Sequence, residues 1–247
     1  MLGDTPYSEA EVHKLDDLIG RVNAQPLAFV VHVGDIGTST TAQACGDAWL
    51  EARQRQFATI RHPFVLLPGD NEWSDCARHG LDPQERLAAW RRLFCTDAPG
   101  LALERQPGRC ENARWHADGM SFIGLNVPGG GEPQLRGPRM DAALEWLDES
   151  LALAEQRGVR RIVLFMHADP RFERVGTGDV YARLRAVLAT HAAWFGSRLV
   201  LVHGDTHVYR DDEPLPGLRR IEVWGSPFVS WLRASIAGGT VKVDTGR

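Results

Sequence analysis

The sequence predicts one α/β domain over residues 1–247, in which two mixed sheets pack together and helices cover their outer faces. In the first part of the chain, segments with helical apolar spacing alternate with short apolar runs, which is typical of parallel strands joined by right-handed crossovers. After residue 214 short strands follow one another without helices, which indicates antiparallel pairing. A chain of 247 residues that is 43% hydrophobic can bury one full core.

The first half of the chain begins with an amphipathic helix over residues 8–23, for which Ser8 is the expected N-cap. Residues 27–33 form a nearly continuous apolar run, as expected of a strand buried on both faces. The remaining elements predicted here are a helix over 41–60, a strand over 64–67 and a helix over 83–94.

The second half begins with strands 113–116 and 121–126, joined by the hairpin signal Asp118-Gly119. The glycine-rich segment 128–133 predicts a flexible loop at the rim of a site. The later elements are a helix over 141–156, a strand over 161–166, a helix over 179–194, a strand over 199–203 and antiparallel strands over 219–224, 227–233 and 241–243.

Composition excludes two classes of partner. A formal net charge of -4 argues against a protein that binds nucleic acid through backbone phosphates. No apolar stretch approaches the length of a membrane span. We therefore expect neither nucleic acid nor membrane as a partner, and the sequence leaves the oligomeric state open.

The amino-terminal residues Met1-Leu2-Gly3-Asp4 lead straight into polar sequence, so no signal peptide is evident. Asp4 resembles the end of a strand whose apolar body is missing. Either the chain is trimmed or its natural start lies upstream. If an upstream signal has been lost, a periplasmic or secreted location is favoured.

The cysteines are Cys45, Cys76, Cys95 and Cys110. None forms a CxxC pair, which argues against a thiolate zinc site. Their even number in loop-rich sequence fits one or two disulfides in an oxidising compartment, but reduced and partly buried thiols are an equal alternative.

Acidic and imidazole side chains follow the apolar runs at the predicted strand ends. They are Asp4; Asp35; Asp70 with Asn71 and Glu72; His167; and Asp205 with His207. Because ligands bind beyond the carboxyl ends of strands in open α/β sheets, we expect these groups to meet at one edge. Oxygen and imidazole ligands suit zinc, manganese, iron or magnesium. Two such ions sharing a carboxylate would clamp a phosphoryl group and turn a bridging water into a nucleophile.

Each motif alone has a simpler explanation. Gly-Asp after a strand is common turn chemistry, so Asp35 or Asp205 by itself would mean little. The pair Asp70-Asn71 could be a turn and a helix cap, and His167 a hydrogen-bonded core residue. Their recurrence at successive strand ends favours the metal site.

Several other residues are weaker candidates. His32, His62, His79 and His116 could act as an acid or an orienting group, although such histidines are more often plain surface or strand residues. Trp73, Trp115, Trp224 and Trp231 are expected to pack, and Arg136 and Arg139 to lie in a solvated loop rather than on a phosphate.

The order and strand context of the motifs resemble the calcineurin-like metallophosphoesterase superfamily, which includes purple acid phosphatases. The family pattern is D-x-H, G-D-x-x, G-N-H-[DE], a lone His and G-H-x-H. The matching residues, spread over nearly the whole chain, are Asp4-Thr5-Pro6, Gly34-Asp35-Ile36-Gly37, Gly69-Asp70-Asn71-Glu72, His167 and Gly204-Asp205-Thr206-His207, with Gly225-Ser226 also similar. The resemblance implies a four-layer α/β/β/α sandwich.

The resemblance also implies a role for each ligand. Asp35 would bridge two ions. Asp4 and His207 would bind the first ion. The second ion would be held by Asp70 at the family's Asn position, by His167, and by Asp205 at a family His position. This carboxylate-rich second site favours manganese, magnesium or calcium over zinc.

Two further departures concern the chemistry. Pro6 replaces a family ligand His and cannot bind metal. Asn71 replaces the His that contacts the phosphate, and it can donate a hydrogen bond but not a proton. Tyr7 could reach the first ion and the substrate instead. His203 shares a strand face with Asp205 and could supply the acid.

These considerations predict a metal-dependent phosphoesterase that hydrolyses a phosphomonoester or a small phosphodiester, with Asn71 steadying a phosphate oxygen. The alternative is a catalytically impaired relative that binds a metal or a ligand, as the loss of the His ligand and the His acid suggests. A different metal-dependent hydrolase is a third interpretation, because fold does not fix reaction.

Overall fold

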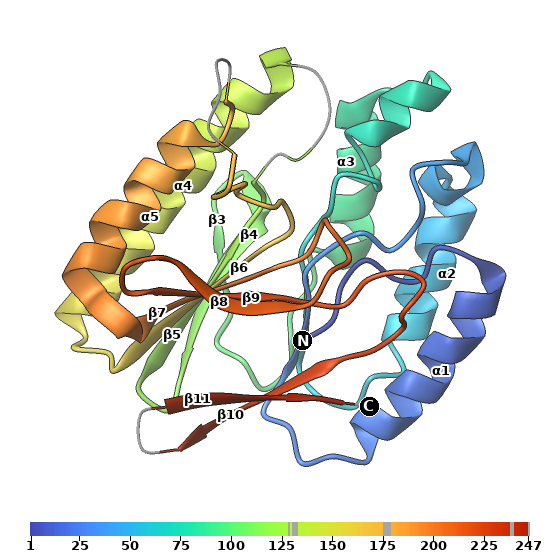
Figure 1. Ribbon diagram of the computed structural model, residues 1–247. Coiled ribbons are helices and arrows are strands. Elements are labelled where there is room, and N and C mark those ends of the chain that lie inside the picture. Colours follow the sequence, from blue (N-terminus) through green and yellow to red (C-terminus); the bar gives the residue numbers. More distant parts are fainter. Residues whose placement is uncertain (128, 130–132, 175–178, 238–239, 247) are drawn as a thin grey trace.

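The computed structural model describes residues 1–127, 129, 133–174, 179–237 and 240–246. It is a sandwich in which helices lie on both outer sides and strands lie between them (Figure 1). None of the helices in these residues is long and apolar enough to cross a membrane. The predicted α/β sandwich is therefore confirmed as the fold class.

The larger layer is a mixed seven-stranded sheet. Its order is β3 (Glu104–Gln106), β4 (Arg109–Ala117), β5 (Met120–Leu125), β6 (Arg161–Met166), β7 (Leu199–His203), β9 (Leu218–Glu222) and β8 (Arg210–Leu215). The strands β5, β6, β7 and β9 run parallel, so their carboxyl ends lie at one edge of the sheet. The β4–β5 hairpin turns at Asp118 and Gly119, whose φ angles of 50° and 72° suit the predicted turn.

The second layer consists of two strand pairs. β1 (Val30–His32) pairs in parallel with β2 (Phe64–Leu66), and β10 (Leu232–Ala237) pairs antiparallel with β11 (Thr240–Thr245). Met1 and Leu2 lie between the pairs, because Leu2 bridges to His32 while Met1 exchanges hydrogen bonds with Leu232.

Helices cover each layer. α1 (Glu9–Asn23), α2 (Asp47–Phe57) and α3 (Pro83–Phe94) lie on the side of the second layer, and α4 (Pro133–Gln156) and α5 (Ala182–Phe195) lie on the side of the larger sheet (Figure 1). Short 3-10 helices are Ala42–Cys45, Asp75–His79 and Gly196–Arg198. Strand β6 shows the layering: Leu164 packs toward α4 and α5, whereas Val163 and Phe165 pack between the sheets. Both faces of the strand are buried, as its continuous apolar sequence predicts.

Some element boundaries differ from those predicted. The helix expected over 41–60 is a 3-10 turn followed by α2, because Gly46 between them has an extended backbone. β1 starts only at Val30, and β10 starts at Leu232 rather than at 227. In the loop expected over 128–133, residues 128 and 130–132 lie outside the described part of the chain.

The expectation that Arg139 lies in a solvated loop is wrong. Helix α4 begins at Pro133, well before residue 141, so Arg139 is a helical and buried residue. Its guanidinium donates to Glu111 at 3.1 Å and lies over the ring of Trp73. The Arg136 side chain lies outside the described part. The four tryptophans named above pack against neighbours, with Trp224 stacked on Tyr209.

The cysteines form two disulfides, Cys45–Cys76 and Cys95–Cys110. The first joins the 3-10 helix Ala42–Cys45, which follows β1, to the 3-10 helix Asp75–His79, which follows β2. It thereby ties together the loops that follow β1 and β2. The structure thus favours the oxidised one of the two alternatives for the thiols.

Candidate metal centre

The acidic and imidazole residues lie where strands of both layers end. Asp4 follows the Met1–Leu2 segment, Asp35 follows β1 and Asp70 follows β2. His167 comes directly after β6, and Asp205 follows β7 by two residues. The parallel strands therefore bring these side chains from distant parts of the sequence to one edge of the sandwich.

Among the residues that the structure describes, two overlapping groups of side chains have ligand atoms close enough to hold an ion. Asp4, Asp35 and His167 form one group, and Asp70, His167 and Asp205 form the other; within each, the ligand atoms lie within 4.8 Å of one another. Nε2 of His167 is 3.4 Å from Oδ1 of Asp35 and 3.4 Å from Oδ1 of Asp70. The shared residue is His167, whereas the resemblance gives the shared role to Asp35. An imidazole nitrogen has one lone pair and a carboxylate has several, so Asp35 is the better bridge.

His207 lies beside the first group. Its Nε2 is 3.6 Å from Oδ1 of Asp4, and its Nδ1 is 2.8 Å from the carbonyl oxygen of Ser226. A proton on Nδ1 donated to that carbonyl leaves the Nε2 lone pair directed at Asp4. This pairing of one ring nitrogen with a carbonyl is how proteins orient metal-binding histidines.

The backbone at the site is strained. Asp4, Asp35, Asp205 and His207 have φ angles of 52°, 60°, 82° and 64°, in the left-handed region that non-glycine residues seldom adopt. Such conformations cost of order 1–3 kcal/mol each and cluster at functional sites. Their recurrence at four of the ligand candidates is independent support for a site here.

The glycines beside these residues leave no room for a side chain. A Cβ on Gly69 would collide with Oδ1 of Asp35, and one on Gly204 would collide with Oδ2 of Asp4. A Cβ on Gly225 would lie 2.6 Å from Cβ of Asp4. The Gly-Asp motifs therefore reflect the close packing of one ligand loop on the next as well as turn chemistry.

The buried polar atoms fit a cation. Oδ2 of Asp4 and both ring nitrogens of His167 are buried without a hydrogen-bond partner among the described residues. Asp4 and His167 are at most 1% exposed. Burying carboxylates without compensation is costly, and divalent cations offset that cost. The donor set thus has the chemistry of a metal site.

Burial and mutual repulsion perturb the acids. Burial raises the pKa of Asp4 well above its usual value, and the Asp35 carboxylate adds to the rise. Burial also opposes ionisation of Asp35, but His167 and hydrogen bonds from Tyr7 and Asn71 outweigh it and hold the pKa of Asp35 below its usual range. Asp35 is thus the acid that the protein itself stabilises as an anion.

Tyr7 and Asn71 support Asp35. The Tyr7 hydroxyl donates to Oδ2 of Asp35 at 2.7 Å, and the backbone N–H of Asn71 donates to Oδ1 at 3.0 Å. The Asn71 amide nitrogen donates its two hydrogens to Tyr7 and to the carbonyl of Gly37, at 3.0 and 2.9 Å. A bond from Asn71 to a substrate would have to replace one of these, so the geometry favours a positioning role.

His203 is poorly placed to act as an acid. It is fully buried, its Nδ1 lies 2.8 Å from the carbonyl of Gly204, and burial lowers its pKa to about 4. At neutral pH the ring is therefore uncharged, and its one N–H donates from Nδ1 to this carbonyl. His62, His79 and His116 bond to Val22, Ser39 and Ser121, away from the metal-ligand groups.

Two further residues hold the site together: His32, which the sequence offered only as a weaker candidate, and Glu11, which sequence reasoning missed. His32 accepts the N–H of Gly34 at Nδ1 and donates from Nε2 to the carbonyl of Thr5, so it joins the loops of Asp4 and Asp35. Glu11 accepts the N–H of Tyr7 and the hydroxyl of Ser226. Buried polar side chains inside helices and strands are the signal that could have revealed them.

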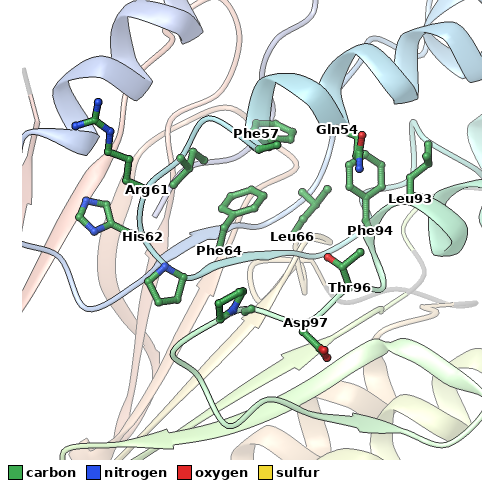
Figure 2. Close-up of a pocket in the computed structure, with 15 residues that line it drawn as sticks. Gln54, Phe57, Arg61, His62, Phe64, Leu66, Leu93, Phe94, Thr96 and Asp97 are labelled. Carbon is green, nitrogen blue, oxygen red and sulfur yellow. The ribbon is translucent and has the colours of Figure 1, made fainter.

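A separate pocket of about 340 Å³ lies on the surface beside α2, α3 and β2 (Figure 2). Arg61, His62 and Asp97 are its charged or imidazole side chains. None of the metal-ligand candidates lines it, so it is distinct from the site at the strand ends.

Comparisons with known proteins support the fold. No protein-family model and no curated protein matches the sequence. A dimetal phosphatase from Danio rerio has a similar structure, with a TM-score of 0.56 and 15% identity over 91% of this chain and 86% of that one.

Two other solved structures are less similar. A Thermotoga maritima protein solved by NMR has a TM-score of 0.36 at 12% identity, over 99% of this chain and 95% of that one. An Aquifex aeolicus protein of unknown function has a TM-score of 0.26 at 10% identity, over 74% and 83%. Both TM-scores are too low to indicate a shared fold. At 15% identity the first likeness shows the fold alone: this chain shares the α/β sandwich of that protein, and its own acidic and imidazole groups could bind metal.

Proposed function

We propose that this protein hydrolyses a phosphate ester, either a phosphomonoester or a small phosphodiester, with two divalent cations. The observation that carries the proposal is the convergence of Asp4, Asp35, Asp70, His167 and Asp205 at one edge of the sandwich. The structural likeness to a protein named a dimetal phosphatase agrees with it. The net charge of -4 favours small substrates over nucleic acid.

Two cations would be held by these residues. Asp4 and His207 would hold the first ion, Asp70, His167 and Asp205 would hold the second, and Asp35 would serve both. Manganese, magnesium, iron and zinc all accept such ligands, and the extra carboxylates favour the harder ions. When bound, the cations polarise phosphate oxygens and lower the pKa of coordinated water.

The remaining residues act through these ligands. Tyr7 and Asn71 each donate a hydrogen bond to one oxygen of Asp35, which holds the carboxylate in the position from which it would bind the cations. His207 is held by Ser226, and Asp205 is held by the N–H of Asp169 at 2.9 Å. The leaving group takes its proton from solvent, because Asn71 cannot supply one.

The second candidate function is a binding module that keeps the cations without efficient catalysis. Pro6 offers no metal ligand at the family's His position, and the Asn71 amide already has its partners. These two features would lower the rate of hydrolysis, but they leave the remaining carboxylate and imidazole groups able to bind an ion.

The test combines metal analysis with hydrolysis of a chromogenic phosphomonoester and a bis-ester in added manganese. We expect about two ions per chain, hydrolysis of at least one ester, and a loss of at least 100-fold in Asp35→Asn. Asp148→Asn, an exposed acid on α4, is the matched control and should behave as wild type. Two ions without hydrolysis would favour the binding module, and no bound ion would contradict both candidates.

A further inference from the structure

Arg171 lies in the loop that follows β6 and His167, and its backbone is strained. Its φ angle of 54° is in the left-handed region that non-glycine residues seldom adopt. Apart from Asp118 in the β4–β5 turn, it is the only described non-glycine residue outside the metal-ligand candidates that has a positive φ. Such conformations cluster at ligand-binding and active sites. Arg171 therefore shares a conformational feature with the residues of the metal centre.

The loop that carries Arg171 is anchored to the metal centre. The backbone N–H of Asp169 donates to Oδ2 of Asp205 at 2.9 Å, and Oδ1 of Asp169 accepts the N–H of Arg171 at 2.9 Å. On the other side of the loop, Arg185 donates to the carbonyl oxygen of Pro170 at 2.8 Å. These contacts hold the strained residue, so its side chain leaves the backbone at a point that is fixed relative to Asp205.

The Arg171 side chain lies over Tyr181. Its guanidinium carbon is 5.5 Å from the centre of the Tyr181 ring, a cation–π arrangement. The Tyr181 hydroxyl donates to the carbonyl oxygen of Gly129 at 3.4 Å, and a Cβ on Gly129 would lie 2.8 Å from Oδ2 of Asp70. Burial raises the pKa of Tyr181, and the Asp205 and Asp70 carboxylates add to the rise. One aromatic ring therefore separates Arg171 from two ligand candidates of the second ion.

The Arg171 guanidinium is available for a ligand. Arg171 is exposed, and none of the described residues forms a hydrogen bond or an ion pair with its guanidinium. Asp179, on which Arg171 acts electrostatically, is already bound by Arg185 through both carboxylate oxygens. Arg171 thus differs from Arg185 and Arg220, whose charges are paired with carboxylates.

The charge of the metal centre leaves a place for this cation. The carboxylates of the two ligand groups are those of Asp4, Asp35, Asp70 and Asp205. Once ionised, they match the charge of two divalent cations, so the loaded centre has no positive charge left for a second anionic group. A guanidinium binds a carboxylate or a phosphate through two parallel hydrogen bonds. Arg171 can therefore supply the counter-charge that the cations do not.

We propose that Arg171 binds a second anionic group of the substrate, so that the preferred substrate is a small phosphate ester that also carries a carboxylate or a second phosphate. This role depends on the proposed function, because the reacting phosphate must first lie at the cations. The second anionic group then lies on the side of Asp70 and Asp205, where Arg171 reaches it beyond the Tyr181 ring. Arg171 binds and orients the substrate and transfers no proton.

The experiment compares three phosphonates by calorimetric titration of the manganese-loaded protein. Propylphosphonate has one anionic group, whereas 3-phosphonopropionate and ethane-1,2-bisphosphonate carry a carboxylate or a second phosphonate in place of its methyl group. Their P–C bonds resist hydrolysis, so binding is measured without turnover. We expect at least one of these two compounds to bind about 10-fold or more tightly than propylphosphonate, because it gains charge-assisted hydrogen bonds. The tighter of the two identifies the second group as carboxylate or phosphate.

The variants test whether Arg171 is the cause of this preference. Arg171→Gln should abolish it, while the affinity for propylphosphonate and the manganese content stay unchanged. Arg171→Lys keeps the charge without the planar fork and should retain part of the preference. Arg174→Gln removes an exposed positive charge from the same loop and should behave as wild type.

Two kinds of failure are distinguishable. Equal affinities of the wild-type protein for the three phosphonates, or an unchanged preference in Arg171→Gln, would overturn the role of Arg171 and leave the metal centre as proposed. An equal loss of preference in Arg174→Gln would also overturn it, because the general charge of the loop would then be the cause. If the manganese-loaded protein bound none of the phosphonates, the proposed function would be contradicted, and the role of Arg171 with it.

Discussion

Nε2 of His207 lies 3.6 Å from Oδ1 of Asp4, so residues from the two ends of the chain meet at the metal centre. Ser226 holds them together: its carbonyl accepts from His207, and its N–H donates to the carbonyl of Asp4 at 2.9 Å. This closed set of contacts holds the two candidate ligands of the first proposed ion in place. It also provides a test that separates the two sites.

Substitution His207→Ala should remove a ligand of the first ion only. We expect the manganese content to fall from about two ions to about one, with affinity at the first site reduced 10- to 100-fold. Elemental analysis after dialysis measures this. His191→Ala on α5, whose side chain pairs with Asp148, is the matched control. Unchanged manganese binding in His207→Ala would exclude this residue as a ligand.

Tyr7→Phe tests the hydroxyl that donates to Asp35. A hydrogen bond to a charged group is worth about 1.5–3 kcal/mol, so we expect kcat/KM toward a phosphomonoester to fall about 10- to 100-fold. Tyr209→Phe is the control, because Tyr209 stacks on Trp224. Equal rates for the two variants would show that the Tyr7 hydroxyl contributes nothing.

Gly204→Ala tests the close packing of the ligand loops. The added methyl group would collide with Oδ2 of Asp4, so metal affinity should fall at least 10-fold as the carboxylate is displaced. Gly20→Ala in α1 has no atom within 4 Å of the new methyl group. It should leave metal binding unchanged and stabilise the helix by about 1 kcal/mol. Calorimetric titration with manganese compares them.

The pH dependence of stability should depend on His32. Burial lowers the pKa of His32 to about 3, whereas an unfolded histidine has a pKa of about 6.5. The unfolded state therefore binds more protons between these values, so stability is full above pH 6.5 and declines as pH falls, by up to about 1.4 kcal/mol per pH unit. Urea unfolding at pH 7.5 and pH 5 should show this slope reduced in His32→Gln.

The control for that experiment is Val31→Ala on the same strand. It removes buried methyl groups, so it should lower stability at both pH values by about the same amount. A pH slope in His32→Gln equal to that of wild type would assign the loss of stability on acidification to other groups.

The two disulfides should differ in their effect on activity. Closing loops of 31 and 15 residues stabilises a chain by about 3.7 and about 3.0 kcal/mol in the chain-entropy model. Replacing either pair with serines should lower the free energy of unfolding by similar amounts. Only the Cys45–Cys76 disulfide ties the loop that follows Asp35 to the segment that follows Asp70, so only its loss should also weaken manganese binding. Equal effects on binding would contradict this.

The sequence by itself determined the α/β class and the positions of the ligand candidates. Apolar runs such as residues 161–166 specify buried strands, and the polar residue that follows a strand is a local feature of the chain. The turn at Asp118-Gly119 and the cap at Ser8 are equally local, and both are present in the structure. Parallel strands then bring the ends of such runs to one edge, which is why the clustering of Asp35, His167 and Asp205 could be anticipated.

Only the tertiary structure decided the partners of individual side chains. The two hydrogens of the Asn71 amide go to Tyr7 and Gly37, His203 is buried against its own loop, and Arg139 pairs with Glu111. Each of these depends on neighbours brought together by the fold, so sequence spacing does not specify them. The strand predicted over residues 27–33 likewise pairs with β2 only from Val30 to His32, because a β-strand is stabilised by its partner as much as by its own sequence.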